Sequence, residues 1–243
     1  MNTRQKVRWS GFSLIELMVS ILILSIVMAG IFRQIELAQT RYMVEGQKLD
    51  MTQQEREFID QLTRDLHQAG FPSVAQYGNL VDLNSPNVAA GVWFISENAL
   101  FMEGDVDGDG IVDSISYTYN DGGSWTGPPQ YNPCPCLQRS QIQKIADWPW
   151  RQPAAVSYTE VQNIIPVAGQ PFFSAFQTDG TPVDLSTPIV LGSNLAVNPL
   201  ARSALQAMKS VRITFTILGK MNDPNSRQPI QVTMTGMARL PNN

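Results

Sequence analysis

The most regular hydrophobic pattern of the sequence is an apolar stretch near its N-terminus. Residues 12–32 carry a single charge, that of Glu16, and Arg33 follows them directly. At ~1.5 Å per residue, an α-helix of this length spans roughly 30 Å, which is the thickness of the hydrocarbon core of a bilayer. The pattern therefore predicts a transmembrane helix. Its one carboxylate needs a separate explanation, because a charge near the middle of a bilayer costs on the order of 2.5–3.5 kcal/mol.

The helical pattern continues beyond this apolar stretch. No proline occurs before Pro72, and an apolar stripe recurs at helical spacing in the second half of the segment. This stripe consists of Phe58, Ile59, Leu62 and Leu66. Gly70 and Pro72 then supply a helix stop. We therefore expect one helix of about 60 residues, about 85 Å long, which is apolar all round in its first half and packs its later stripe on a globular head.

After Pro72 the pattern changes to short apolar runs between turn residues, which is typical of β-strands. Apolar and polar residues alternate most clearly over residues 211–217 and 230–234. Such alternation predicts two antiparallel strands with one face on a core, and the helix stripe is the natural cover for that face. Further strands are expected at residues 92–95, 99–102 and 114–119, short apolar segments at 161–167 and 172–176, and a short helix at 198–208. The predicted fold class is α+β: a long N-terminal helix packed on a C-terminal antiparallel β-sheet head.

The composition agrees with a turn-rich head that is exported. Only 16% of the 243 residues are charged, whereas 43% are hydrophobic, and the formal net charge is −4. No basic patch of the kind that binds nucleic acid is visible, so we expect no nucleic-acid partner. The sequence also lacks the G-x-S-x-G elbow, the phosphate-binding glycine loop and the H-E-x-x-H motif. We therefore predict that the chain is not an enzyme and has no catalytic residues.

The residues before the apolar stretch indicate its orientation and its processing. Arg4, Lys6 and Arg8 precede it, which predicts a cytoplasmic N-terminus and an exported head. An ordinary secretory signal places its small-residue cleavage site after the apolar region. Here the small residue, Gly11, comes before that region. Cleavage at Gly11 would remove a short hydrophilic leader and keep the helix on the mature protein.

Residues 105–113 form an acidic loop with the sequence DVDGDGIVD. Asp105, Asp107 and Asp109 alternate ahead of a turn glycine, Ile111 would offer its backbone carbonyl, and Asp113 adds a fourth carboxylate. This order resembles a calcium-binding loop, but a serine stands where an EF-hand has its bidentate glutamate. The pattern favours a weak Ca²⁺ site, with a Kd of roughly 10⁻⁴–10⁻³ M, slightly over a solvated Asp-Gly turn between two strands.

The two cysteines, Cys134 and Cys136, are separated by one proline. This order is neither a C-x-x-C redox motif nor half of a zinc site with a second half elsewhere. In an exported head it favours a tight local disulfide slightly over two free thiols, although one intervening residue constrains the geometry of such a bond.

The N-terminal residues together resemble the signal of type IV prepilins: a basic leader, Gly11, Phe12, and then Ser-Leu-Ile-Glu-Leu with Glu16 five residues past the junction. The resemblance implies that a prepilin peptidase cuts between Gly11 and Phe12 and that the new α-amine of Phe12 is methylated. It also implies that Glu16 pairs with an α-amine, of its own chain or, as the resemblance favours, of a neighbouring subunit. The alternative is that Glu16 lies at the lipid headgroups and is stabilised by the helix dipole.

This resemblance also implies a domain organisation and a location. Residues 1–11 are the leader, residues 12–33 the transmembrane and filament-core helix, residues 34–70 its amphipathic extension, and residues 71–243 the β-rich head. The chain is expected to cross the inner membrane once, with the head in the periplasm. It would then leave the membrane for an extracellular pilus by packing its helix against other major and minor pilins.

Later segments are similar in pattern to the PilW family of minor pilins. They are RDLHQAGF near the end of the helix, the acidic loop that enters a strand, SVRITFTI, and the terminal ARLPNN. This resemblance implies a structural subunit of a type IV pilus that helps to initiate assembly or caps the filament. The alternatives are the J-type pseudopilin of type II secretion, which shares the long helix and large β head, and a calcium-dependent adhesin carried on the pilus.

Overall fold

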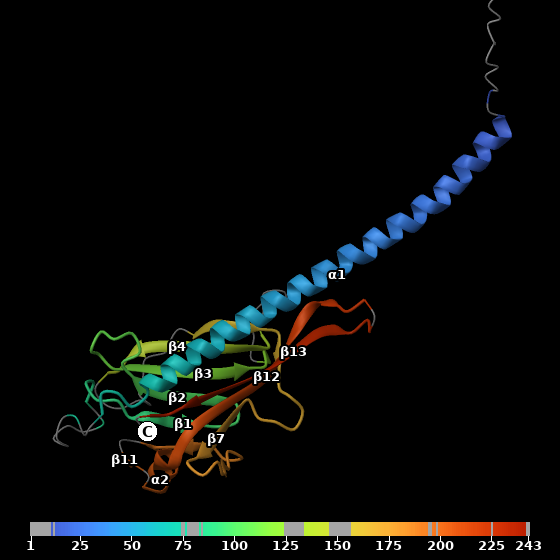
Figure 1. The fold of residues 1–243 in the computed structure, drawn as a ribbon. Helices are drawn as coiled ribbons and strands as arrows, with labels where there is room; N and C mark the ends of the chain where they lie inside the picture. The colour runs from blue at the N-terminus through green and yellow to red at the C-terminus, as the bar shows by residue number, and fades with distance from the viewer. Residues whose placement is uncertain are drawn as a thin grey trace, which may run out of the picture.

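The computed structural model shows one long helix that projects from a β-rich head (Figure 1). It describes residues 11, 13–73, 76, 83, 85–123, 134–145, 157–193, 196–197, 199–224 and 226–241. The α+β fold class predicted from the sequence is confirmed.

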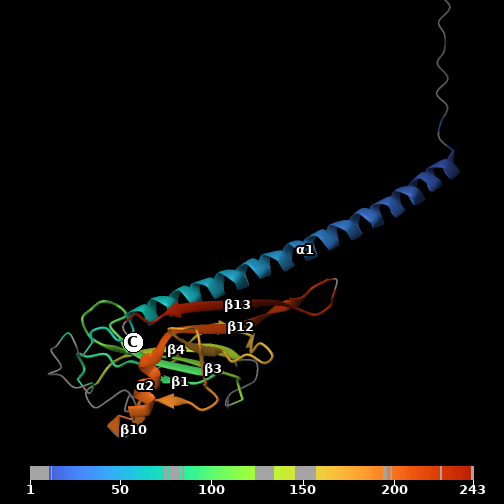
Figure 2. The ribbon, with the colours of Figure 1, turned by 60° about the horizontal axis from the view of Figure 1, so that its bottom comes forward.

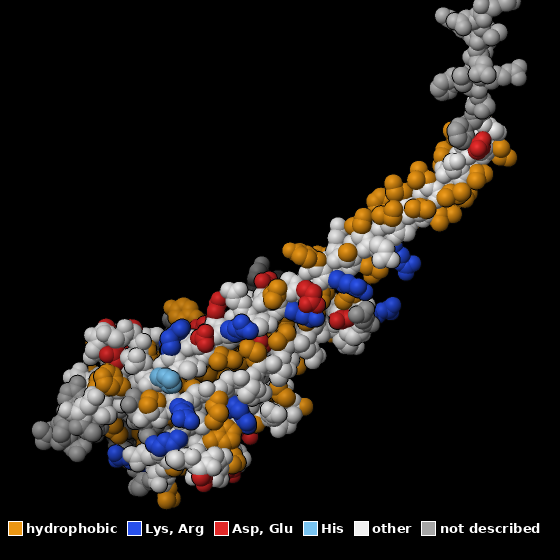
Figure 3. All heavy atoms as spheres, viewed as in Figure 1, with side chains coloured by type: hydrophobic (Ala, Val, Ile, Leu, Met, Phe, Trp, Pro, Cys, Tyr) orange, Lys and Arg blue, Asp and Glu red, His pale blue; other side chains and the backbone are white. Residues whose placement is uncertain are grey.

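Helix α1 runs without interruption over 55 residues, Leu14–Gln68, which corresponds to about 80 Å. Apolar side chains cover the half that lies away from the head on the face that Figure 3 shows. A window of 18 residues has a mean hydropathy of 2.6 and is 0% buried, so the helix is long and apolar enough to cross a membrane. The helix ends as predicted, because Gly70 adopts a positive φ of 80° directly after the C-cap, Ala69.

The described part of the head contains two large antiparallel sheets and one short strand pair. The larger has the strand order β5-β4-β3-β2-β1-β9. Its strands are β1 (Gly91–Ile95), β2 (Ala99–Gly104), β3 (Asp113–Asn120), β4 (Cys136–Gln143), β5 (Ser157–Gln162) and β9 (Ile189–Val190). The predicted strands at residues 92–95, 99–102 and 114–119 are thus present, and β2 and β3 flank the acidic loop.

The second sheet has the order β13-β12-β7-β8, and β6 pairs with β12 beside it. Its strands are β6 (Ile164–Ile165), β7 (Phe173–Gln177), β8 (Pro182–Val183), β12 (Met208–Asn222) and β13 (Pro229–Arg239). The predicted C-terminal pair is confirmed, since Ile213 lies opposite Gly236 and Phe215 opposite Met234. A short pair, β10 (Gly192–Ser193) and β11 (Ala196–Val197), precedes helix α2 (Pro199–Ala207), which lies within the predicted helical segment.

The second half of α1 packs on both sheets and runs alongside β13 (Figure 2). Phe58 makes edge-to-face contacts with Tyr117 of β3 at 5.7 Å and with Phe215 of β12 at 6.0 Å between ring centroids. A Cβ at Gly236 of β13 would lie 2.8 Å from the Ile59 side chain, so only glycine allows this close approach. The predicted stripe of the helix is therefore the cover of the C-terminal strands, and it also covers the larger sheet.

Strand β4 was not predicted. The sequence pattern predicted no strand between residues 119 and 161, whereas Cys136 begins β4 and pairs with Asn120 at the end of β3. The part of this segment at residues 124–133 lies outside the described residues. Strand β4 has the sequence CLQRSQIQ and shows no apolar alternation, because Arg139 and Gln141 take part in a polar network described below.

Candidate functional site

The predicted processing junction lies at the start of α1. Gly11 is exposed, and Phe12 lies outside the described residues, as do the basic residues of the leader. Ser13 has an extended conformation and is the N-cap of the helix, although its side chain makes no capping hydrogen bond. Its carbonyl accepts the N–H groups of Glu16 and Leu17, at 3.0 and 3.1 Å. Glu16 therefore lies in the first turn, next to the helix N-terminus.

The surroundings of Glu16 within the chain are apolar and open. Every described residue from 13 to 39 is exposed, and the first buried residue of α1 is Val44. Nearby hydroxyl groups are satisfied within the helix, since Ser20 and Ser25 donate to the carbonyls of Glu16 and Ile21 at 2.8 Å each. The described part of the head thus offers Glu16 no counter-charge. A charged partner would have to come from the N-terminus, a lipid headgroup or another subunit.

The acidic loop brings three of its predicted carboxylates together. The ligand oxygens of Asp105, Asp107 and Asp109 lie within 4.8 Å of one another. Asp105 is buried and accepts the N–H groups of Gly108 and Gly110, at 2.9 and 3.1 Å. Both glycines have positive φ angles, 77° and 86°, which let the loop curl around this side chain. The cluster offers the oxygen atoms that a hard divalent cation prefers.

The other two predicted ligands lie differently. Asp113 opens β3, is 4% exposed, and accepts a hydrogen bond from Gln141 at 2.8 Å. Burial raises the pKa of Asp113 to about 6, and the neighbouring carboxylates of the loop add to this shift, whereas Gln141 opposes it. Asp113 is not part of the three-carboxylate cluster. Ile111 donates its N–H to Asp109 at 2.8 Å, and its carbonyl stays a predicted ligand.

The acidic loop is fixed directly to the end of α1. The N–H of Asp105 donates to the carbonyl of Phe71 at 2.9 Å, and the N–H of Gly70 donates to Glu103 at the same distance. A Cβ at Gly104 would collide with the Gln68 carbonyl, so β2 meets the helix end through a glycine. The start of the acidic loop and the end of α1 are thus held together by direct backbone hydrogen bonds, and we call this contact the joint.

A buried polar network crosses the same joint and was not predicted from the sequence. Asp65 of α1 is 1% exposed and accepts hydrogen bonds from Tyr117 of β3 and from Arg139 of β4, the latter at 2.8 Å. Arg139 donates to Gln141 at 2.9 Å, and Gln141 donates to Asp113 at 2.8 Å. Burial and the adjacent Asp65 raise the pKa of Tyr117, so the phenol stays a donor. The network connects the helix to the acidic loop.

A second buried ion pair in the head joins Lys144 to Glu103. Lys144 donates to Glu103 at 2.7 Å, and to the carbonyls of Leu83 and Val88 at 2.6 and 2.7 Å. The N–H of Ala90 also donates to Glu103, at 3.0 Å. Both charged side chains are at most 1% exposed. The pair connects the segment before β1 to the end of β2, and no periodic pattern in the sequence predicts it.

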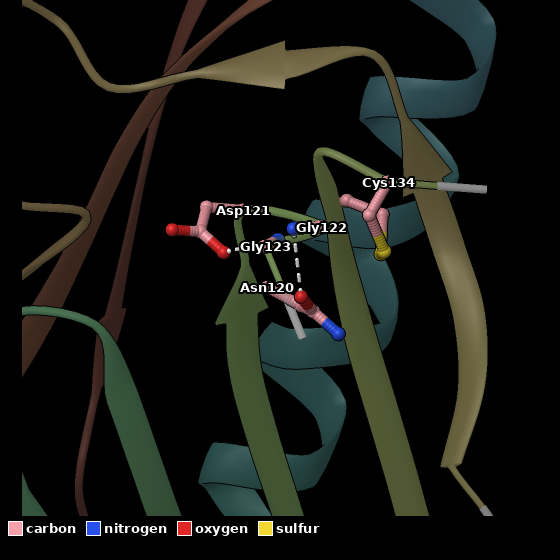
Figure 4. Close-up of a disulfide and its surroundings, with 6 residues drawn as sticks. Asn120, Asp121, Gly122, Gly123 and Cys134 are labelled. Atoms are coloured by element: carbon pink, nitrogen blue, oxygen red, sulfur yellow. Dashed lines mark hydrogen bonds between the residues drawn. A yellow bond between two sulfur atoms is a disulfide. The ribbon is translucent and has the colours of Figure 1, made fainter. Parts of the chain in front are cut away.

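The two cysteines form a disulfide in the structure, beside the turn at residues 120–123 (Figure 4). Within this turn Gly122 donates to the Asn120 side chain and Gly123 to the Asp121 side chain, at 2.8 Å each. The Cys134–Pro135 peptide bond is cis. The bridge lies where β4 begins, opposite the end of β3. This position, at the base of the connection between two central strands, is structural in character.

Comparison with known proteins identifies the N-terminal segment alone. Residues 10–32 match the family model of the prokaryotic N-terminal methylation motif. No curated protein and no solved structure matches the chain. The matched residues contain the predicted junction, Gly11 and Phe12, together with Glu16 and the apolar helix. The motif supports a type IV prepilin-like protein that is processed by a prepilin peptidase and assembles with other pilins, and it does not distinguish among the members of that class.

Proposed function

We propose that the chain is a minor pilin of a type IV pilus, a structural subunit that helps to initiate assembly or caps the filament. The observation that carries this proposal is the methylation motif at residues 10–32 on a helix whose apolar half contacts no described part of the head. A helix of this kind needs lipid or other helices around it. A subunit that moves from the inner membrane into a filament meets both needs in turn.

The size of the head supports a minor rather than a repeated role. The described head holds two large sheets and lies at the opposite end of α1 from the apolar half (Figure 1). Such a head suits the end of a filament, where one side has no neighbour. The J-type pseudopilin of type II secretion is the alternative, because it shares the long helix and the large β head. Cross-linking and pull-down from the native membrane decide between them: pilus minor pilins as partners support our proposal, and secretion pseudopilins overturn it.

Processing at Gly11 is the first test. Substitution Gly11→Ala should block cleavage, because the peptidase is expected to read a residue without a side chain at the junction. Gly30→Ala is the matched control, since a Cβ at Gly30, as at Gly11, meets nothing within 4 Å. Mass spectrometry of the membrane-bound protein should find the leader retained in the first variant and removed, with a methylated Phe12, in the second. A normal mature N-terminus in Gly11→Ala would contradict the assignment.

We further propose that the acidic loop binds Ca²⁺ weakly through Asp105, Asp107 and Asp109, with Asp113 nearby. The three carboxylates whose oxygens lie within 4.8 Å support this proposal, because their mutual repulsion is relieved by a cation. Adhesion through a calcium-loaded head would add a role to the filament subunit rather than replace it. A solvated turn without a cation is the alternative.

Calcium binding is tested with a substitution that removes charge and keeps the turn. Asp107 accepts the N–H of Asp109, and an asparagine oxygen can accept it as well. Asp121→Asn is the control, because Asp121 makes the same kind of turn outside the loop. Millimolar Ca²⁺ should raise the melting temperature of the wild-type chain and of Asp121→Asn in detergent, and should raise that of Asp107→Asn much less. An unchanged melting temperature in the wild type would exclude the site.

A further inference from the structure

A hollow of about 790 Å³ lies on the face of the second sheet that points away from the core. We call it the cationic hollow. It is lined by Phe176 of β7, Lys209 and Arg212 of β12, and Met237 and Arg239 of β13, with turn residues around them. Alternation along β12 explains the position, because Val211 and Ile213 point into the core and Arg212 between them points the other way. Lys and Arg side chains gather over this end of the C-terminal strands (Figure 3).

The charged residues found to line the hollow are basic. Among the described residues, three basic side chains and no acidic side chain line it. Neither Arg212 nor Arg239 takes part in an ion pair within the described part of the chain. Asp179 precedes the lining residue Gly180 in the sequence. Its carboxylate accepts the N–H of Thr181 in the turn between β7 and β8. The hollow thus concentrates positive charge on a chain whose net charge is −4.

Among the basic residues of the hollow, Arg212 is the best suited to bind a ligand. Its guanidinium stacks over the Phe176 ring, 4.7 Å from the ring centroid, which holds the fork in a fixed plane. Its Nε is buried and has no hydrogen-bond partner among the described residues. The Arg212 side chain as a whole is only partly buried, and a planar guanidinium held in place matches the two oxygens of a carboxylate.

We propose that the cationic hollow binds a carboxylate of an acidic segment on a neighbouring filament subunit. The apolar side chains beside the arginines, Phe176 and the exposed Met237, fit an apolar residue next to that carboxylate. A long polyanion such as nucleic acid fits less well, because it would extend from the hollow over a chain with 21 acidic and 17 basic residues. The proposed filament role supplies the source of the carboxylate, and to that extent the inference rests on it.

The test measures binding of a peptide to the full chain in detergent. The probe is a fluorescein-labelled, C-terminally amidated hexapeptide, Gly-Leu-Glu-Glu-Leu-Gly, and its counterpart carries two glutamines in place of the glutamates. Fluorescence anisotropy should show that the first binds, that the second does not, and that added salt weakens binding. Arg212→Gln and Arg239→Gln should each weaken binding about tenfold. Arg202→Gln, which removes an exposed cation on α2, should leave the affinity unchanged.

Several outcomes would overturn the proposal. They are equal binding of the two peptides, an equal loss in Arg202→Gln, or preferential binding of a labelled single-stranded oligonucleotide or of inorganic phosphate. Near-UV circular dichroism checks that each variant is folded, and the exposed Arg239 carries the test if Arg212→Gln does not fold. Peptide binding does not require assembly, so a chain that binds the peptide but forms no pilus would contradict the proposed function and the filament partner, and would leave standing only the carboxylate site in the hollow.

Discussion

At the scale of single residues, the most unusual side chain of the head-packed helix is Glu55. It lies well beyond the apolar half of α1, is 0% exposed, and neither of its carboxylate oxygens has a hydrogen-bond partner among the described residues. Burial raises the pKa of Glu55 to about 7, from an ordinary value of 4.5. The carboxyl group is therefore held protonated at the contact between helix and head under mildly acidic conditions.

The sign of the resulting pH dependence follows from this raised pKa. The folded chain holds the proton of Glu55 more tightly than the unfolded chain, so its contribution to stability is complete below about pH 4.5. It is lost as the pH rises through about 7, at a cost on the order of 3 kcal/mol. Glu55→Gln should remove this loss, as seen by urea unfolding of the full chain in detergent at several pH values. Glu57→Gln, an exposed neighbour, should keep it, and an unchanged profile in Glu55→Gln would refute the assignment.

At the scale of elements, the joint between α1 and the head depends on polar as well as apolar contacts. Phe58, Leu62 and Leu66 supply the apolar packing, and each is at most 3% exposed. Asp65 lies on the same face and carries the buried network to β3 and β4. A carboxylate at a buried helical position is stable only when its charge is paired and its oxygens are hydrogen-bonded. The joint is therefore specified by the geometry of these hydrogen bonds as well as by the burial of apolar side chains.

The network at the joint makes Asp65 a sensitive position. Asp65→Asn keeps the shape of the side chain but leaves the partly buried Arg139 without its counter-charge, so the free energy of unfolding should fall by about 2–3 kcal/mol. Asp60→Asn, on the exposed side of the same helix, should change it little. The double variant with Arg139→Gln should lose less than the sum of the two single losses. Strict additivity of the two substitutions would show that the pair is not coupled.

The elements differ in how well the sequence predicts them, and the reason is physical. Helix α1 and strands β12 and β13 bury one apolar face each, so their periodicity is visible in the chain. Strand β4 faces a polar network, and its partner Asp65 is 74 residues away from Arg139 in sequence. Local pattern cannot reveal such a pairing. The available signal was Asp65 itself, a charge at helical spacing between Leu62 and Leu66.

At the scale of the whole molecule, the chain consists of the exposed first part of α1, residues 14–39, which we call the rod, and a folded head. The helix is first buried against the head at Val44. The head pairs buried charges internally, as Glu103 and Lys144 show. The rod cannot bury its apolar surface within the chain, because none of its described side chains before residue 40 contacts the head closely enough to be even half-buried. The molecule as a whole is therefore incomplete without a membrane or neighbouring helices around the rod.

The candidate sites on the rod and on the head differ in how far the sequence predicts them. The motif that contains Gly11, Phe12 and Glu16 was predictable, because it has a fixed spacing and residues 10–32 match a known family model. The arginines of the cationic hollow were not, because Arg212 and Arg239 are brought together only by the register of β12 on β13. Single polar positions on a strand have no periodic signal of their own. Motifs read by another protein are thus visible in the sequence, whereas surfaces built by folding are not.

We propose that Glu16 pairs with the α-amine of a neighbouring subunit, which is a contact of the assembled filament. Glu16→Ala should insert in the membrane at least as well as the wild type, because it removes the one charge of the apolar stretch. It should nevertheless assemble poorly, because the α-amine of a neighbouring subunit loses its partner on entering the filament. Glu36→Ala, an exposed carboxylate on the same helix beyond Arg33, is the matched control and should assemble normally. Membrane fractionation and quantification of sheared pili measure the two steps separately, and unchanged incorporation of Glu16→Ala into pili would reject the pairing.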